Sequence, residues 1–299
     1  MMEYITNKGK IMLKKKFIAL LLFFTVLLGL PISLTNVAAA AAPKAKNLTS
    51  VTQSVNHASP ETPIIFSHRG SPYNNPDHSF SGYNRAIKDG TQYIEQDVWL
   101  SKDNKLYVSH DDNLKKSTGS NVTISKSTSA ELDKVKLRNG EKLHQLKDVF
   151  NRYGKKVHYI IETKKNAGDN TDTEKALAKE IKKYNMKNNL IMQDESIPGI
   201  KIFHKSLKNV PILWLLDSVT ERQYSEEIEN APRYIKFVSI RLEQWTPKLI
   251  KLAHKNGFKT NGWIINTYND NYNALNTLKL DSVFTNNTKE TAHLIDKWK

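Results

Sequence analysis

Two acidic residues, Glu95 and Asp97, stand two positions apart in an apolar run at residues 93–100. On a β-strand this spacing places both carboxylates on the same face. Neighbouring carboxylates repel each other unless a cation lies between them, so the pair suggests a metal site. Glu162, in the apolar run at residues 158–162, offers a third carboxylate. Three carboxylates favour a hard cation, Ca²⁺ or Mg²⁺, over zinc. The alternative is that the carboxylates pair with lysines on a solvated strand.

A hairpin is predicted to bring His110 to these acids. Asp103 and Asn104 form the tip of a tight turn, because both residue types tolerate the positive φ that such turns need. If the turn has two residues, Asp97 and His110 are cross-strand partners, with Cβ atoms about 5 Å apart. The sequence therefore predicts a histidine beside the metal carboxylates, provided that this register holds.

Phosphodiester cleavage is the chemistry that this set of residues suits. His68, directly after the apolar run at residues 64–67, offers a second imidazole. One histidine would remove the proton from an attacking hydroxyl, and the other would donate a proton to the leaving alcohol. Arg69 and Lys164 are predicted to contact the phosphate, Arg69 bidentately and Lys164 as a point charge. A lone histidine is usually structural, but two histidines after predicted strands beside three acids favour catalysis.

Short β-branched runs alternate with amphipathic helical patterns from residue 63 to the C-terminus. The predicted strands are residues 64–67, 93–100, 158–162, 190–193, 212–216, 236–240, 259–265 and 282–285. Eight strands separated by helices favour a (β/α)8 barrel, in which catalytic groups sit at the C-terminal ends of the strands. A doubly wound open sheet is the alternative, although no glycine-rich dinucleotide or phosphate-binding motif follows the first strand.

The composition of the chain excludes several classes of protein. The 299 residues include no cysteine, which excludes disulfides, a cysteine nucleophile, thiolate metal sites and iron–sulfur clusters. The chain is 39% hydrophobic and 25% charged, as is typical of a globular protein. Its formal net charge of +15 favours an anionic partner or surface. The lysines are scattered and match no nucleic-acid-binding module, so nucleic acid is not an expected partner.

The N-terminus has the order of a secretory signal peptide. Five lysines between residues 8 and 16 precede an uncharged apolar run at residues 17–30, and small residues follow at 37–42. The apolar run is short for a membrane span, although a retained anchor is the alternative. We therefore predict a secreted protein, associated with the cell wall where that wall is anionic. The predicted parts are a signal peptide (1–42), a flexible leader (43–62) and a catalytic domain (63–299).

Several segments resemble the motifs of the glycerophosphodiester phosphodiesterase family, in its secreted bacterial form. His68-Arg69-Gly70, residues 93–103 and residues 108–112 match the family signature in order and spacing. The segments at residues 161–164, 263–266 and 284–286 are similar to later elements of the same family. The likeness runs from about residue 63 to the C-terminus.

The resemblance implies a TIM barrel with a small insertion after the second strand, at about residues 113–142. It also implies one divalent cation, with Ca²⁺ favoured over Mg²⁺ for an exported enzyme. The implied site residues are Glu95, Asp97 and Glu162 for the metal, His68 and His110 for acid–base catalysis, Arg69 and Lys164 for phosphate, and Trp263, Phe80 and Tyr73 as apolar walls.

The reaction that the resemblance implies begins with attack by a neighbouring hydroxyl of the substrate on phosphorus. Water then opens the resulting cyclic phosphate. The products would be sn-glycerol 3-phosphate and an alcohol such as choline, ethanolamine or glycerol. Small glycerophosphodiesters and glycerol-phosphate wall polymers are both candidate substrates.

One element departs from the family pattern. The family's Pro-Glu-Asn-Thr element is Pro76-Asp77-His78-Ser79 in this chain. Aspartate is shorter than glutamate by one methylene, and histidine replaces asparagine, while Ser79 keeps the ability to cap the helix that follows. The departure bears on substrate range and rate rather than on the reaction type.

Three alternatives to this function remain open from the sequence. A phosphatidylinositol-specific phospholipase C type shares the barrel and two histidines, but its bacterial forms need no metal. A sphingomyelinase D-like enzyme carries a disulfide that this chain cannot form. A catalytically weakened barrel that binds anionic wall polymer or a partner protein would have no need of two histidines and three acids.

Overall fold

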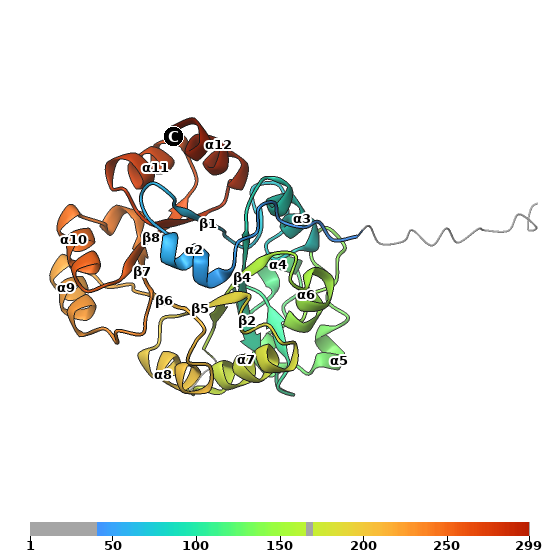
Figure 1. Cartoon of the computed structure of the whole chain (residues 1–299). Coiled ribbons are helices and arrows are strands. Elements are labelled where there is room, and N and C mark those ends of the chain that lie inside the picture. The colour runs from blue at the N-terminus through green and yellow to red at the C-terminus, as the bar shows by residue number, and fades with distance from the viewer. Residues whose placement is uncertain (1–40, 166–169, 299) are drawn as a thin grey trace, which may run out of the picture. The chain divides into compact units, whose positions relative to one another are not determined.

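A computed structural model describes residues 41–165 and 170–298 of the chain. Residues Ala42–Lys299 form one compact unit. Eight parallel strands pair in the order β1-β9-β8-β7-β6-β5-β4-β2, and a further pairing of β1 with β2 closes the sheet. The chain is therefore a (β/α)8 barrel, as predicted (Figure 1). The barrel strands are β1 (Ile64–Ser67), β2 (Tyr93–Leu100), β4 (His158–Thr163), β5 (Leu190–Asp194), β6 (Ile212–Leu215), β7 (Phe237–Arg241), β8 (Lys259–Ile265) and β9 (Ser282–Thr285).

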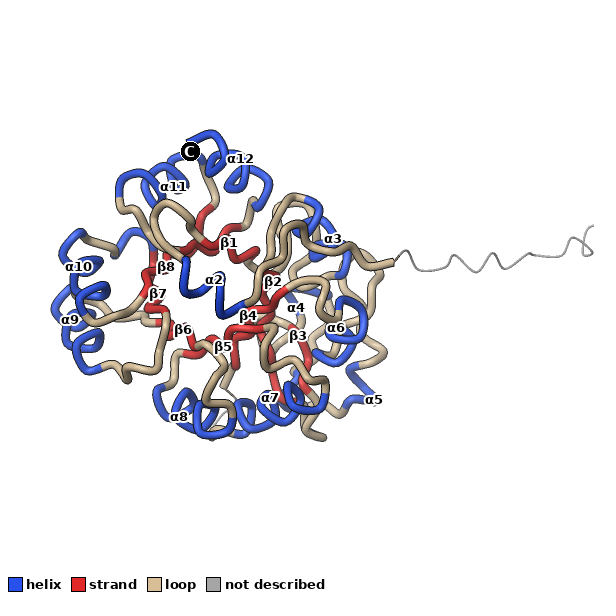
Figure 2. The backbone as a smooth tube through the Cα atoms, viewed as in Figure 1, coloured by secondary structure: helices blue, strands red, loops and turns tan. Residues whose placement is uncertain are grey.

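Helices surround the ring of strands (Figure 2). Polar caps mark where several begin: the Ser79 hydroxyl accepts a hydrogen bond from the backbone N–H of Gly82, as predicted, and Thr246 caps a helix that starts with Pro247. The main helices are α3 (Phe80–Lys88), α6 (Leu146–Tyr153), α7 (Asp172–Lys183), α8 (Ile197–Ser206), α9 (Glu221–Asn230), α10 (Pro247–Lys255), α11 (Tyr268–Tyr272) and α12 (Thr288–Trp298). Shorter helical segments are η2 (Leu242–Gln244) and η3 (Asn273–Thr277).

Side chains alternate along β2 between the inside and the outside of the barrel. Ile94 and Val98 join the large apolar layer between strands and helices, whereas Tyr93 joins the apolar cluster inside the barrel. Glu95 and Asp97 share the face of Tyr93 and therefore point inward. The interior cluster comprises Phe66, Tyr93, Ile160, Ile191, Leu213, Phe237 and Phe284, with partly buried Trp263. Apolar residues thus fill the body of the barrel and leave the carboxylates toward the C-terminal end of the strands.

Residues 43–62 are not the flexible leader that the sequence predicted. They contain helix α2 (Val51–His57), whose buried Val51 and Val55 pack into the interior cluster. The segment also contacts the first residues of three strands. The Ser54 hydroxyl hydrogen-bonds the hydroxyl of Tyr93, the Thr49 carbonyl lies 2.5 Å from Nε2 of His158, and Nζ of Lys259 donates to the Ala58 carbonyl over 2.6 Å.

Helix α2 therefore covers the N-terminal end of the barrel, opposite the carboxylates, and Figure 2 shows it across the ring of strands. The polar composition of the segment favoured a leader without structure. A helix places Val51 and Val55, which are four residues apart, on the same buried face. The predicted signal peptide lies outside the described residues, apart from its last two positions. Within the described ranges, no helix is long and apolar enough to cross a membrane.

The hairpin after β2 differs from the predicted one by one position. Strand β3 (Leu106–Val108) pairs Val98 with Val108, and the backbone N–H of Ser109 donates to the Asp97 carbonyl over 3.0 Å. The cross-strand neighbour of Asp97 is therefore Ser109, and the predicted pairing with His110 is wrong. The backbone N–H of Ser101 donates to the Lys105 carbonyl over 2.8 Å, which leaves a three-residue loop that ends at Asn104, with φ +59°.

A small insertion follows this hairpin, as predicted for residues 113–142. It contains α4 (Lys115–Thr118), η1 (Ile124–Lys126) and α5 (Ser129–Leu132). These short segments enclose an apolar cluster of their own, which comprises Tyr107, Leu114, Ile124, Leu132, Val135, Leu137 and Leu143. The cluster fixes the insertion beside the C-terminal end of β2.

Candidate active site

The three acids predicted as metal ligands lie inside the barrel at neighbouring strand positions. Asp97 on β2 is the register partner of Glu162 on β4, and Glu95 stands two residues before Asp97 on the same face. All three are buried, with exposed fractions of 1% for Glu95 and Asp97 and 5% for Glu162. Buried carboxylates are stable only when cations or hydrogen-bond donors surround them.

Lys164 and Arg69 supply positive charge to these acids. Nζ of Lys164 lies 3.1 Å from Oδ1 of Asp97 and also forms an ion pair with Glu162. The backbone N–H of Arg69 donates to Oε2 of Glu95 over 2.6 Å, and Nε of Arg69 lies 3.6 Å from Oδ2 of Asp97. The predicted phosphate-binding residues thus lie directly beside the predicted metal ligands.

The acids differ in how strongly they hold a proton. Burial raises the pKa of Glu95 well above its usual value, and the Asp97 charge adds to this effect. Burial acts in the same direction on Asp97, but Lys164, His78 and Arg69 outweigh it and hold the pKa of Asp97 well below its usual value. Burial raises the pKa of Glu162 to about 7, although Lys164 opposes the shift. Such crowding of carboxylates is the environment in which a divalent cation is stabilised.

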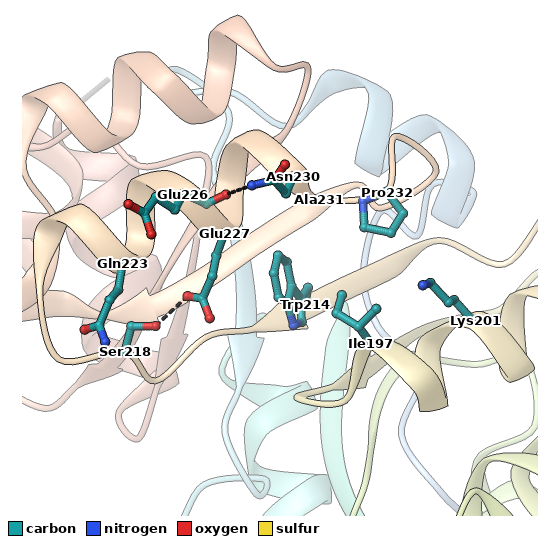
Figure 3. Close-up of a pocket in the computed structure, with 10 residues that line it drawn as sticks. All are labelled: Ile197, Lys201, Trp214, Ser218, Gln223, Glu226, Glu227, Asn230, Ala231 and Pro232. Atoms are coloured by element: carbon teal, nitrogen blue, oxygen red, sulfur yellow. Dashed lines mark hydrogen bonds between the residues drawn. The ribbon is translucent and has the colours of Figure 1, made fainter.

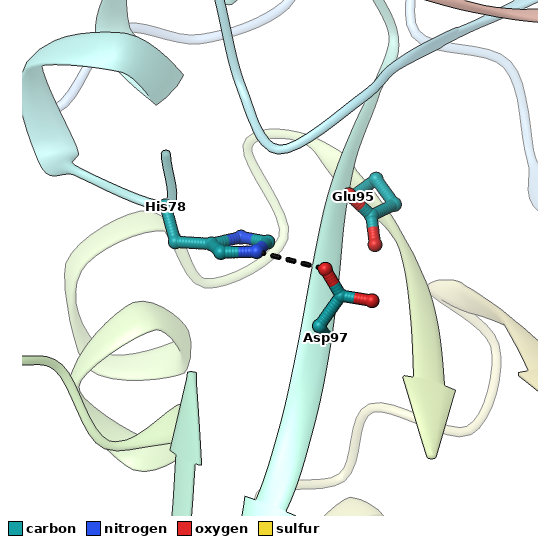
Figure 4. Close-up of side chains that lie close together, drawn as sticks. All are labelled: His78, Glu95 and Asp97. Carbon is teal, nitrogen blue, oxygen red and sulfur yellow. Dashed lines mark hydrogen bonds and ion pairs between the residues drawn. The ribbon is translucent and has the colours of Figure 1, made fainter. Parts of the chain in front are cut away.

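His78 is a member of the site that sequence reasoning missed. Its Nε2 lies 3.0 Å from Oδ2 of Asp97, and its Nδ1 lies 3.1 Å from the hydroxyl of Tyr83 (Figure 4). His78, Glu95 and Asp97 each offer a ligand atom, and these three atoms lie within 4.8 Å of one another. The departure of this element from the family pattern was visible in the sequence, but the reach of the imidazole to Asp97 was not.

The loop after β1 has the backbone shape that this arrangement needs. Arg69 and Gly70 have φ of +52° and +93°. A Cβ atom on Gly70 would lie 3.1 Å from the backbone of Gly82 and Tyr83, so only glycine fits where the loop passes α3. His78, with φ +59°, donates its backbone N–H to the Arg69 carbonyl over 2.9 Å. The tight loop therefore positions both Arg69 and His78 next to the buried carboxylates.

His68 lies at the end of β1, where it was predicted. Its Nδ1 lies 2.7 Å from Oδ1 of Asn286, and the amide nitrogen of Asn286 donates to Oδ1 of Asn266 over 2.7 Å. Burial lowers the pKa of His68 to about 4, and the charge of Arg69 contributes to the shift. The ring is therefore neutral at pH 7, and Nδ1–H donates to Asn286, which leaves the lone pair of Nε2 free to accept a proton.

His110 follows the hairpin and lies near enough to Asp97 for the charge of that carboxylate to act on its ring. Its Nδ1 lies 2.8 Å from Oδ1 of Asp111, and its carbonyl accepts a hydrogen bond from Nε1 of Trp99 over 3.1 Å. Its side chain is 38% exposed. Burial lowers the pKa of His110, while the charge of Asp97 and the hydrogen bond to Asp111 act to raise it. The ring thus lies at the edge of the site, open to solvent.

The three aromatic residues predicted as substrate walls have different environments. Trp263 lies near the end of β8 with the guanidinium of Arg241 4.4 Å from its ring centre. Tyr73 is 70% exposed in the loop after β1. Phe80 stacks on His144, with ring centres 3.7 Å apart, and packs against the core. These contacts pack Phe80 at the start of α3.

A groove of about 510 Å³ opens beside His110, between the loop after β1 and the insertion. Its lining includes Tyr73, Asp77 and His78 from the loop and His110, Lys116 and Arg138 from the other side. Another cavity, of about 480 Å³, lies between α8 and α9 around Trp214 (Figure 3). None of the predicted site residues lines that second cavity.

The barrel and its buried site define the class of protein, and comparison with known proteins agrees. Residues 68–290 match the model of the glycerophosphoryl diester phosphodiesterase family, so the chain belongs to this family and is an enzyme of its class. A glycerophosphodiester phosphodiesterase of Caldanaerobacter subterraneus is 25% identical over 245 residues, which cover 78% of this chain and 98% of the relative.

Solved structures of the same class share the fold. A glycerophosphodiester phosphodiesterase from Parabacteroides distasonis has a TM-score of 0.68 at 20% identity, over 79% of this chain and 97% of that one. A phosphodiesterase from Oleispira antarctica, in complex with the product sn-glycerol-3-phosphate, has a TM-score of 0.67 at 20% identity. The match covers 78% of this chain and 97% of that one. The family resemblance of the sequence is confirmed.

Proposed function

We propose that this enzyme hydrolyses glycerophosphodiesters to sn-glycerol 3-phosphate and an alcohol, with a divalent cation and two histidines. The observation that carries the proposal is the set of three buried, inward-facing carboxylates with Lys164 and Arg69 directly beside them. The family match and the glycerol-phosphate product bound to a relative of the same fold support the substrate class.

Glu95, Asp97 and Glu162 would hold the cation, and their oxygen atoms suit Ca²⁺ or Mg²⁺. Such a cation, when bound, neutralises charge on the phosphate and so favours attack on phosphorus. We favour Ca²⁺ because a secreted enzyme meets this ion at higher concentration. His78 contacts Asp97 and would orient that ligand.

His68 is the residue that we assign as the general base. Its Nδ1–H is held by Asn286, so Nε2 is the atom that accepts the proton of the substrate hydroxyl next to the phosphodiester. The oxygen of that hydroxyl then bonds to phosphorus as the bond from phosphorus to the leaving alcohol oxygen breaks. The product of this step is a cyclic phosphate.

His110 is the residue that we assign as the general acid. Asp111 at 2.8 Å from Nδ1 stabilises the imidazolium form, and Nε2–H is the group that gives its proton to the leaving alcohol. Water then opens the cyclic phosphate with the two roles exchanged. Arg69 and Lys164 would hold the nonbridging phosphate oxygens throughout.

The test is hydrolysis of glycerophosphocholine by residues 43–299, with released glycerol 3-phosphate measured. We expect activity with added Ca²⁺, at least tenfold loss after EDTA treatment, and recovery when Ca²⁺ is added back; Mg²⁺ is compared in parallel. No product from a folded protein supplied with either ion would overturn the proposal. Activity that EDTA leaves unchanged would overturn the metal requirement alone.

We also propose that the enzyme acts outside the cell. The basic, apolar and small-residue order of residues 8–42 supports export, and the positive charge of the chain suits an anionic wall. The test is the mass of the protein recovered from the culture medium and from the wall fraction. A processed chain that begins near residue 43 supports the proposal, and an unprocessed chain confined to the cell contradicts it.

A further inference from the structure

The groove beside His110 has a distribution of charge that the proposed reaction does not explain. Of the two carboxylates that line it, Asp77 accepts a hydrogen bond from Nη1 of Arg69 over 3.0 Å, and Asp111 is bound by His110. The charge of Asp77 is therefore paired with a cation, and the carboxylate of Asp111 is hydrogen-bonded by the imidazole of His110. The groove also holds two cations from the insertion, Lys116 and Arg138.

Lys116 and Arg138 pair with no carboxylate in the described part of the chain. Nε of Arg138 donates to the backbone carbonyl of Lys116 over 3.1 Å, which holds the guanidinium beside α4. The remaining guanidinium donors and the lysine ammonium are thus available to a ligand. The buried apolar side chains of Val108, Leu137 and Leu143 also line the groove.

The groove lies on the side of the site where the leaving alcohol departs. His110 lines it, whereas His68 does not. Under the proposed function His110 protonates the leaving oxygen, so the rest of the leaving group extends from His110 into the groove. A volume of about 510 Å³ is in the range of small-molecule sites and exceeds what a bare glycerol would fill.

We propose that this groove binds the leaving group and selects an alcohol that carries negative charge, such as glycerol bearing a second phosphate, over a cationic alcohol such as choline. Lys116 and Arg138 make this selection, Arg138 through bidentate contact with phosphate oxygens. This inference rests on the proposed function and specifies its substrate class. Because the insertion supplies both cations, it acts as the specificity element of the enzyme.

The test compares kcat/KM for three diesters that share the glycerol 3-phosphate half. Glycerophosphocholine has a cationic leaving group, glycerophosphoglycerol has a neutral one, and glycerophosphoglycerol phosphate has an anionic one. We expect the wild-type enzyme to prefer the anionic diester to glycerophosphocholine by at least tenfold at low ionic strength. The preference should weaken in 0.5 M salt, because the cations are exposed to solvent.

Two double variants decide whether the groove causes the preference. In Lys116→Gln/Arg138→Gln we expect kcat/KM for the anionic diester to fall about tenfold and that for glycerophosphocholine to rise slightly. The matched control is Lys126→Gln/Lys134→Gln, which removes the same charge from exposed positions of the insertion outside the groove. We expect it to change the preference less than twofold. Thermal unfolding of each variant confirms that the insertion is folded.

The outcomes separate this inference from the proposed function. Hydrolysis of all three diesters without preference, or equal loss of preference in both double variants, overturns the inference and leaves the proposed function standing. No hydrolysis of any diester overturns both. A Lys116→Glu/Arg138→Glu variant that is folded and now prefers glycerophosphocholine would give the strongest support.

Discussion

Nε2 of His78 lies 3.0 Å from Oδ2 of Asp97, so an imidazole from the loop after β1 fixes the orientation of a buried acid on β2. Tyr83 on α3 bonds the opposite ring nitrogen of His78. A metal-ligating carboxylate whose partner is fixed in this way keeps its geometry, and such partners contribute about 10- to 100-fold to metal affinity.

The first prediction concerns His78. We expect His78→Ala to weaken Ca²⁺ binding at least tenfold, measured by calorimetry, because Asp97 loses its orienting donor. His78→Asn restores a donor of similar position and should recover most of the affinity. Equal affinity in wild type and His78→Ala would show that His78 only fills space.

The second prediction concerns the pH dependence of catalysis. The pKa of His68 is lowered to about 4, so this base stays unprotonated well below pH 6.5. With Ca²⁺ held at saturation, kcat/KM should show no loss from His68 protonation until the pH falls toward about 4. An acidic limb of kcat/KM with a midpoint near 6.5 at saturating Ca²⁺ would contradict the low pKa.

The third prediction concerns helix α2, which covers the N-terminal end of the barrel. Val55 is buried there at 4% exposure, while the adjacent Asn56 is exposed. Val55→Asp should lower the free energy of unfolding by about 2–4 kcal/mol, because it buries a charge against the interior cluster. Asn56→Asp is the matched control and should change it by less than about 0.5 kcal/mol. Denaturant unfolding measures both, and equal effects would contradict the packing role of α2.

The fourth prediction concerns Asn286, which we assign as a positioning residue for His68. Asn286→Ala should lower kcat about tenfold with little change in KM, because the ring loses the bond that fixes its tautomer. Asn286→Asp, which keeps an acceptor for Nδ1–H, should recover activity. An unchanged kcat in Asn286→Ala would show that the ring needs no such support.

The sequence predicted much of the barrel because its signals are local. Alternating residues along β2 determine which side chains face the interior, so Glu95 and Asp97 were assigned to one face correctly. Glu162 and Lys164 follow from the same periodicity at the end of β4. Parallel strands meet at one end of a barrel, so these groups converge without any knowledge of long-range contacts.

Features that depend on contacts between distant segments could not be predicted from the sequence. The hairpin at Asn104 has three loop residues rather than two. The extra loop residue shifts the strand register by one position, so the cross-strand partner of Asp97 is Ser109 instead of His110. The contact between His78 and Asp97 and that between His68 and Asn286 join elements far apart in the chain. Their distances are set by tertiary packing, which residue types alone do not specify.

The central claim is that His68 and His110 act as base and acid, and leaving-group chemistry tests it most directly. We would measure kcat/KM of wild type, His68→Ala and His110→Ala on glycerophosphocholine and on p-nitrophenyl glycerophosphate, whose leaving group needs no proton. Both variants should lose at least 100-fold on glycerophosphocholine. On the p-nitrophenyl ester His110→Ala should recover to within about tenfold of wild type, while His68→Ala stays inactive. Equal losses for both variants on both substrates, or recovery by His68→Ala instead, would contradict the assignment.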